Sequence, residues 1–157
     1  MKKNDFNYME TVKQFKETDC GRYGKAFEIN VKHYLNGNRG NSDRVSAKGK
    51  TDVKSKGVKY EIKSNCGELN DDILKNDFII YTPDNVTEYD KPANAKVIPS
   101  HDFVELFHTL GLVRTKKSTN GQLKTTIQSY RNSKRKTEML FNALAQYSTL
   151  GEWVSTL

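Results

Sequence analysis

The chain has few apolar residues, and this shortage excludes membrane proteins. Only 35% of its 157 residues are hydrophobic, which is low for a globular protein. No run approaches the roughly 18 apolar residues that a membrane-spanning helix needs. The first ten residues, MKKNDFNYME, contain no apolar segment of the kind found in a signal peptide. We therefore expect a cytoplasmic protein that has no membrane partner.

Cysteine is also scarce, which argues against a disulfide framework or a structural zinc site. The two cysteines, Cys20 and Cys66, form no Cys-x-x-Cys pair. We expect both to be free thiols in a reducing compartment. The eight Tyr, seven Phe and one Trp argue against disorder, and the length suits one domain with a real core. We therefore expect residues 1–157 to form a single domain.

Acidic residues are absent from one long stretch of the chain. Residues 112–137 contain eight Lys or Arg and no Asp or Glu, whereas the net charge of the whole chain is +7. A concentrated basic region is typical of a nucleic-acid footprint, although a solvated basic helix start gives the same pattern. Tyr130 lies inside this region and could stack on a base or a ribose. We expect DNA to bind the basic C-terminal region, about 112–157. The candidate contact residues are Lys116, Lys117, Lys124, Arg131, Lys134, Arg135 and Lys136.

Hydrophobic periodicity and turn residues predict helices on both sides of a group of strands. The expected helices span about 6–15, 23–35, 100–110 and 133–147, and the expected strands span about 44–47, 52–63, 78–81 and 96–98, with a further hairpin around Asn120-Gly121. This order predicts an α/β or α+β domain in which helices flank a mixed sheet. We expect Tyr34 to face the core, Ser100 to cap its helix, and Trp153 to be a packing anchor or a partner contact.

The segment 52–63 predicts a two-faced hairpin that turns at Lys56-Gly57, because glycine supplies the positive φ that such turns need. The expected pairs are Ser55 with Val58, Lys54 with Lys59, Val53 with Tyr60, and Asp52 with Glu61. Alternation then puts Val53, Val58, Tyr60 and Ile62 on one face, and Asp52, Lys54, Lys59, Glu61 and Lys63 on the other. A solvated hairpin face shows the same alternation, so this pattern alone leaves both interpretations open.

Glu28 on an early helix, Asp52 at the start of the hairpin, and Glu61-Ile62-Lys63 together resemble the PD-(D/E)XK nuclease superfamily. The resemblance covers about residues 21–81. Thr51 replaces the Pro of the motif. The spacing of Gly21, Gly24 and Glu28 is most similar to archaeal-type Holliday junction resolvases and related phage enzymes. The resemblance implies a restriction-endonuclease-like αβββαβ core.

The resemblance also implies a metal-dependent DNA endonuclease that uses Mg²⁺ or Mn²⁺. In such a site Asp52, Glu61 and the backbone carbonyl of Ile62 bind the metal. Glu28 binds a second metal or orients a water, and Lys63 acts on the attacking water or on the developing charge. The implied catalytic residues are therefore Asp52, Glu61, Lys63 and Glu28.

Two other functions remain open at this point. A nuclease-like protein could hold nucleic acid without cutting it, and a small regulatory protein could use the basic region to bind an acidic protein. Nucleic-acid binding should weaken steeply with salt. The chain is small for clamping two DNA strands alone, so a homodimer is also an expectation.

Overall fold

The computed structural model describes residues 19–35, 52–65, 67–117, 119–130 and 132–157. The strands are β1 (Val53–Ser55), β2 (Val58–Ser64), β3 (Phe78–Thr82), β4 (Lys96–Pro99), β5 (Val113–Lys117) and β6 (Leu123–Ile127). The α-helices are α2 (Asp19–Leu35), α3 (Asn85–Glu88), α4 (Ser100–Thr109), α5 (Lys134–Leu144) and α6 (Leu150–Ser155), and the 3₁₀ helices are η2 (Asp71–Lys75) and η3 (Pro92–Asn94). The predicted helix at 6–15 and the predicted strand at 44–47 lie outside the described residues. None of the helices in the described part is long and apolar enough to cross a membrane.

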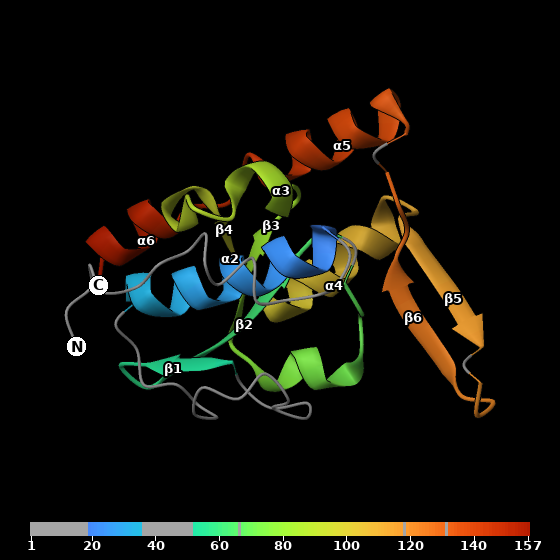
Figure 1. The fold of residues 1–157 in the computed structure, drawn as a ribbon, viewed down its shortest axis with the longest axis horizontal. Helices are drawn as coiled ribbons and strands as arrows, with labels where there is room; N and C mark the ends of the chain where they lie inside the picture. Colours follow the sequence, from blue (N-terminus) through green and yellow to red (C-terminus); the bar gives the residue numbers. More distant parts are fainter. Residues whose placement is uncertain (1–18, 36–51, 66, 118, 131) are drawn as a thin grey trace.

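The main sheet is mixed, as predicted. It has four strands in the order β1-β2-β3-β4. Strands β1 and β2 are antiparallel, β2 and β3 are parallel, and β3 and β4 are antiparallel. Strands β5 and β6 form a separate two-stranded sheet, which stands beyond one end of the main sheet in Figure 1. The predicted class, a mixed sheet flanked by helices, is therefore confirmed.

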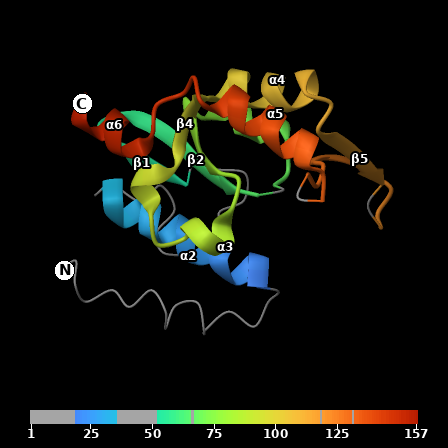
Figure 2. The same cartoon turned by 90° about the horizontal axis from the view of Figure 1, so that it is seen from above.

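Side-chain alternation along the strands builds one core on each face of the main sheet. On one face Tyr60, Ile62 and Ile80 pack with residues of α2 and α6. On the other face Ile79 and Tyr81 pack with residues of α4 and α5. Figure 2 shows α2 and α3 on one side of the strands and α4 and α5 on the other. Both faces of the central strands are thus covered, which is why β3 is a continuous apolar run.

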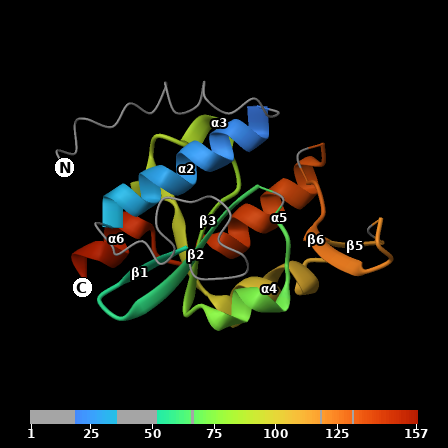
Figure 3. The same cartoon turned by 60° about the horizontal axis from the view of Figure 1, so that its bottom comes forward.

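The predicted hairpin forms with its predicted turn. Lys56 and Gly57 have φ values of 52° and 81°, the positive values that a tight hairpin turn requires. Three of the four expected pairs are present: Val53 with Tyr60, Lys54 with Lys59, and Ser55 with Val58. The apolar face enters the core, because Val53, Tyr60 and Ile62 are buried. Figure 3 shows this hairpin and the β5–β6 hairpin at opposite ends of the molecule.

Two sequence-based expectations about helices are wrong. Tyr34 is 38% exposed, because the buried stripe of α2 runs through Ala26, Phe27, Asn30 and Val31 instead. Ser100 is not the cap of α4, since Pro99 precedes the helix in that position. The Ser100 hydroxyl instead donates to the backbone carbonyl of Asn76 at 2.6 Å.

The C-terminal region holds two helices where the sequence predicted one. Helix α5 ends at Leu144, and α6 begins after a capping box in which Thr149 and Glu152 bond each other's backbone N–H groups. Trp153 on α6 is a packing anchor, which is one of the two roles that the sequence analysis expects for it. Its ring lies 4.6 Å from that of Phe78, and its Nε1 donates to the Tyr60 hydroxyl at 2.9 Å.

We expect Trp153→Phe to lower the free energy of unfolding by about 1 kcal/mol, since it keeps a ring against Phe78 but removes the hydrogen bond to Tyr60. Chemical denaturation measures this change. The control is Phe141→Leu on α5, where the side chain is 49% exposed and the expected change is below about 0.5 kcal/mol. Equal effects of the two substitutions would show that the Trp153 hydrogen bond adds no stability.

Candidate active site

Asp52 is attached to β2 by its backbone and by its side chain. The regular ladder stops at Val53, so the predicted pair of Asp52 with Glu61 is not a regular strand pair. The N–H of Asp52 donates to the carbonyl of Tyr60 at 3.1 Å. Oδ2 of Asp52 accepts the N–H of Ile62 at 2.8 Å. These two bonds hold the Asp52 carboxylate beside the second half of the motif.

The Glu61 carboxyl lies beside that of Asp52, close enough for the two groups to affect each other's ionisation. The pKa of Glu61 rises from 4.5 to about 9, first because its carboxyl is buried and then because of the neighbouring, negatively charged Asp52. Lys63 acts in the opposite direction and lowers that pKa. Asn76 Nδ2 lies 3.5 Å from Glu61 Oε2. Two acidic groups therefore share one site, and Glu61 keeps its proton at neutral pH.

Lys63 is half-buried on the same face of β2 as Glu61. Its aliphatic chain crosses the backbone of Gly67, where an added Cβ would lie 3.1 Å from Lys63 Cδ and 3.7 Å from Nζ. The absence of a side chain at Gly67 therefore gives Lys63 its position. The structure brings Asp52, Glu61 and Lys63 together as the hairpin register predicts.

Glu28 approaches the same acids from α2. Burial raises its pKa most, and the negative charge of Asp52 raises it further. Gly24, one turn earlier on α2, faces the side chains of Ser64 and Asn85, which would lie 3.3 Å from a Cβ at that position. A small residue at Gly24 thus lets α2 lie close to the end of β2.

Sequence reasoning missed two residues that contact the acids. Lys32 is only 8% exposed, and its Nζ lies 3.5 Å from Glu28 Oε2. Lys32 lies four residues after Glu28, a helical spacing that indicates an ion pair. Asn76, which contacts Glu61, lies just after η2. The connection between β2 and β3 places it beside the acids. No sequence pattern pointed to it.

The donor atoms suit a hard divalent cation better than a soft one, because they are all carboxyl oxygens. A cation would offset the burial and the repulsion by Asp52 that together raise the Glu61 pKa. Across the described residues, however, no three His, Cys, Asp or Glu side chains are arranged as a metal-binding group. Asp52 and Glu61 form a pair, whereas Glu28 is bonded to Lys32. The chemistry of the pair fits a metal, with Glu28 outside the pair.

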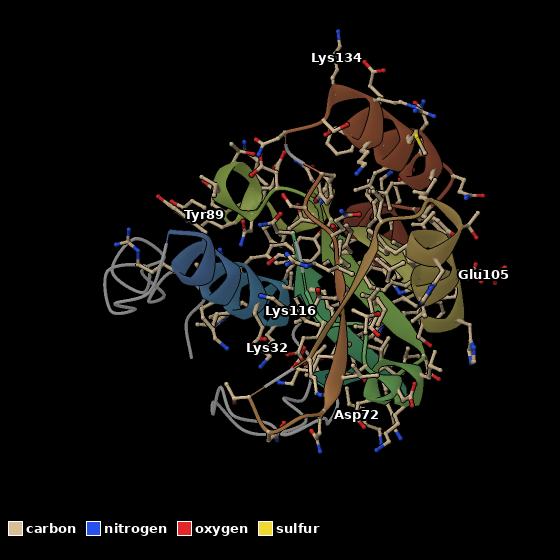
Figure 4. All side chains as sticks on the ribbon, turned by 90° about the vertical axis from the view of Figure 1, so that its right-hand side faces the viewer. Lys32, Asp72, Tyr89, Glu105, Lys116 and Lys134 are labelled. Carbon is tan, nitrogen blue, oxygen red and sulfur yellow. The ribbon has the colours of Figure 1, made fainter. Side chains whose placement is uncertain are left out.

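The predicted nucleic-acid-binding residues fall on two separate elements. Lys116, Lys117 and Lys124 are exposed on the β5–β6 hairpin, where Lys124 Nζ lies 3.6 Å from Glu68 Oε1. On α5, Lys134 and Arg135 are exposed and Lys136 is half-buried. Arg131 lies outside the described residues. In Figure 4, Lys134 points outward from α5, well away from Lys116 on the hairpin.

Tyr130 does not serve as a stacking platform, contrary to the sequence-based expectation. It is only 2% exposed. Its hydroxyl donates to the carbonyl of Pro83 at 2.7 Å and lies 3.1 Å from the Tyr81 hydroxyl. Tyr130 therefore belongs to the core that α5 covers.

Comparisons of the chain with protein-family models, with curated proteins and with solved structures find no match.

Proposed function

We propose that the chain is a metal-dependent DNA endonuclease with a restriction-endonuclease-like fold. The order α2-β1-β2-β3-α3-β4 agrees with the αβββαβ order that the motif resemblance implies. One observation carries the proposal. The Asp52 carboxylate, held by the Ile62 N–H at 2.8 Å, lies beside the half-buried Glu61 carboxyl, and Lys63 lies on the same face and lowers the Glu61 pKa. A fully solvated hairpin face would not hold two acids together and out of water in this way.

Asp52, Glu61 and the carbonyl of Ile62 would hold Mg²⁺ or Mn²⁺ in this proposal, and Glu28 would bind a second ion or a water. The bound cation would lower the pKa of a water molecule and offset negative charge on a phosphodiester. Lys63 would stabilise the charge that develops on the phosphate oxygens. Lys32 partly offsets the burial and the Asp52 charge that raise the pKa of Glu28.

The test is cleavage of labelled duplex, single-stranded and junction DNA by the full chain. We expect cleavage of at least one substrate in Mg²⁺ or Mn²⁺ and none in EDTA. The comparison of the three DNA forms also identifies the preferred substrate. Cleavage that persists unchanged in EDTA, or no cleavage of any substrate in either metal, would refute the proposal.

A second candidate is a nucleic-acid-binding protein that does not cut. It is favoured by the lack of a third metal-binding side chain beside Asp52 and Glu61 within the described part of the chain. Titration with Mn²⁺ separates the two functions. A nuclease should bind the ion through Asp52 and lose that binding in Asp52→Asn. A binding protein should show DNA binding without any Mn²⁺ site.

A further inference from the structure

The β5–β6 hairpin is an arm that extends from the domain. Only its base enters the core, through Ile127 and the packing of Val113. From Arg114 to Lys117 every residue of β5 is exposed. Figure 1 shows both strands standing apart from the main sheet. A two-stranded ribbon on its own has little stability in water, so the packing of its base is what holds the arm to the domain.

The base of the arm is bonded to the segment that follows the candidate active site. The Ile127 N–H donates to the carbonyl of Gly67 at 2.9 Å, and the Leu69 N–H donates to the carbonyl of Thr125 at 2.8 Å. Glu68 and Thr126 form an isolated antiparallel bridge between these bonds. Because Gly67 also contacts Lys63, the arm begins directly beside the site.

Positive charges face each other across the arm. Lys116 is directly opposite Lys124, and like charges at opposed positions destabilise a strand pair. Arg114 lies two residues before Lys116 and therefore on the same face. Glu68 offsets the charge of Lys124 in part, while residues 113–127 contain no acid. An anionic partner would remove this repulsion.

An apolar side chain is exposed on the other face of the arm, beside Lys117. Leu123 is 73% exposed at the outer end of β6, and it is paired with Lys117. The major groove of DNA, about 12 Å wide, admits a two-stranded ribbon. Two-stranded ribbons also enter the minor groove, where apolar side chains can insert between base steps while basic side chains contact the DNA. Five-residue strands give the arm a length of about 17 Å, enough to reach the bases.

We propose that the β5–β6 arm enters a groove of duplex DNA and holds the duplex against the candidate active site. Arg114, Lys116 and Lys117 contact phosphates, and Leu123 contacts the bases. The proposal that the arm binds DNA depends only on the charges and the exposure of the arm itself. The delivery of DNA to Glu61 and Lys63 rests on the function proposed above.

The first test measures binding of the full chain to a fluorescent DNA duplex in EDTA, over a range of salt concentrations. We expect the double variant Lys116→Ala/Lys117→Ala to bind at least about 10-fold more weakly and to lower the salt slope by about 2, since each phosphate contact contributes about 0.9. The control is Lys75→Ala/Lys91→Ala, two exposed lysines outside the arm. The same Kd and slope in the arm variant and the wild type would overturn the proposal.

Thermal unfolding shows whether the arm variant is folded. Removing Lys116 relieves the repulsion of Lys124, so we expect a Tm equal to or above that of the wild type, together with weaker DNA binding. If the two lysines had a purely structural role, the double variant would have both a lower Tm and weaker DNA binding. If Tm falls, the charge-keeping variant Lys116→Arg/Lys117→Arg decides the matter, because it must restore tight DNA binding for the proposal to stand.

The second test addresses Leu123 with a duplex that contains 2-aminopurine, whose fluorescence rises when it is unstacked. We expect the wild type to raise the signal and Leu123→Ser to bind with the same salt slope but without the rise. An equal rise with both proteins would refute base contact by Leu123. If the lysine variant loses binding to an RNA duplex but still binds the DNA duplex as the wild type does, DNA is refuted as the partner.

Cleavage assays separate this proposal from the proposed function. If the arm variant loses binding in EDTA while the wild type cuts no DNA in Mg²⁺, the arm is confirmed and the nuclease function fails. If the wild type cuts DNA, and the arm variant matches the wild type in both cutting and binding, the nuclease function stands and the proposal for the arm fails.

Discussion

Replacing Asp52 with asparagine is expected to reduce DNA cleavage by about a thousand-fold, the loss typical when one group that stabilises a charged transition state is removed. The asparagine oxygen can still accept the N–H of Ile62, which Asp52 accepts at 2.8 Å. The fold should therefore persist while the negative charge of the pair is lost. Single-turnover cleavage in Mg²⁺ measures the effect, and circular dichroism checks the fold.

Lys63→Met should produce a loss of the same order, because methionine keeps the aliphatic chain over Gly67 but removes the cation. Lys59→Met is the matched control. Lys59 lies on the same face of β2 but is exposed at its far end, so its loss should change the cleavage rate less than about threefold, the factor that corresponds to about 0.6 kcal/mol. Near-normal cleavage by Asp52→Asn or by Lys63→Met would disprove the assigned chemistry.

Glu61→Gln is expected to stabilise the metal-free protein at pH 8. The pKa of Glu61 is about 9 in the folded chain, against an ordinary value of 4.5. The unfolded chain therefore loses this proton at lower pH than the folded chain does. The stability contributed by Glu61 is complete below pH 4.5 and falls as the pH rises towards 9. Glutamine does not ionise, so the variant should lose this part of the pH dependence.

We expect the gain at pH 8 to be about 2 kcal/mol, less than the full shift would give because part of the carboxyl group faces water. Denaturation curves at pH 5 and pH 8 measure it. Added Mg²⁺ should stabilise the wild type at pH 8, since a ligand that binds the folded state raises its stability. It should stabilise Glu61→Gln much less. Parallel pH profiles for the two proteins would contradict the raised pKa of Glu61.

Local rules were sufficient for the hairpin and for the side-chain pairing across it. Gly57 fixed the turn, and the turn fixed which residues of β1 and β2 are opposed. A period of two then separated the buried Tyr60 and Ile62 from Glu61 and Lys63. These features depend on residues close in sequence, so their geometry does not require the rest of the chain.

Errors arose where several side chains compete for the same space. The apolar character of Tyr34 and Tyr130 did not reveal that Tyr34 would be left on the surface and Tyr130 enclosed in the core. The cap of α4 moved to Pro99 because the Ser100 hydroxyl bonds to Asn76, a residue far from it in the sequence. Such choices depend on which elements are neighbours, and periodicity does not contain that information.

By itself the sequence determined a mixed α/β domain, a hairpin that opposes an acid to a Glu-x-Lys strand, and a concentration of positive charge near the C-terminus. Only the tertiary structure decided that Glu61 keeps its proton beside Asp52, that Lys32 bonds to Glu28, and that the basic residues divide between an arm and α5. The physical reason is burial. The pKa of Glu61 rises first because packing removes water from its carboxyl group, and packing is set by contacts between segments distant in the chain.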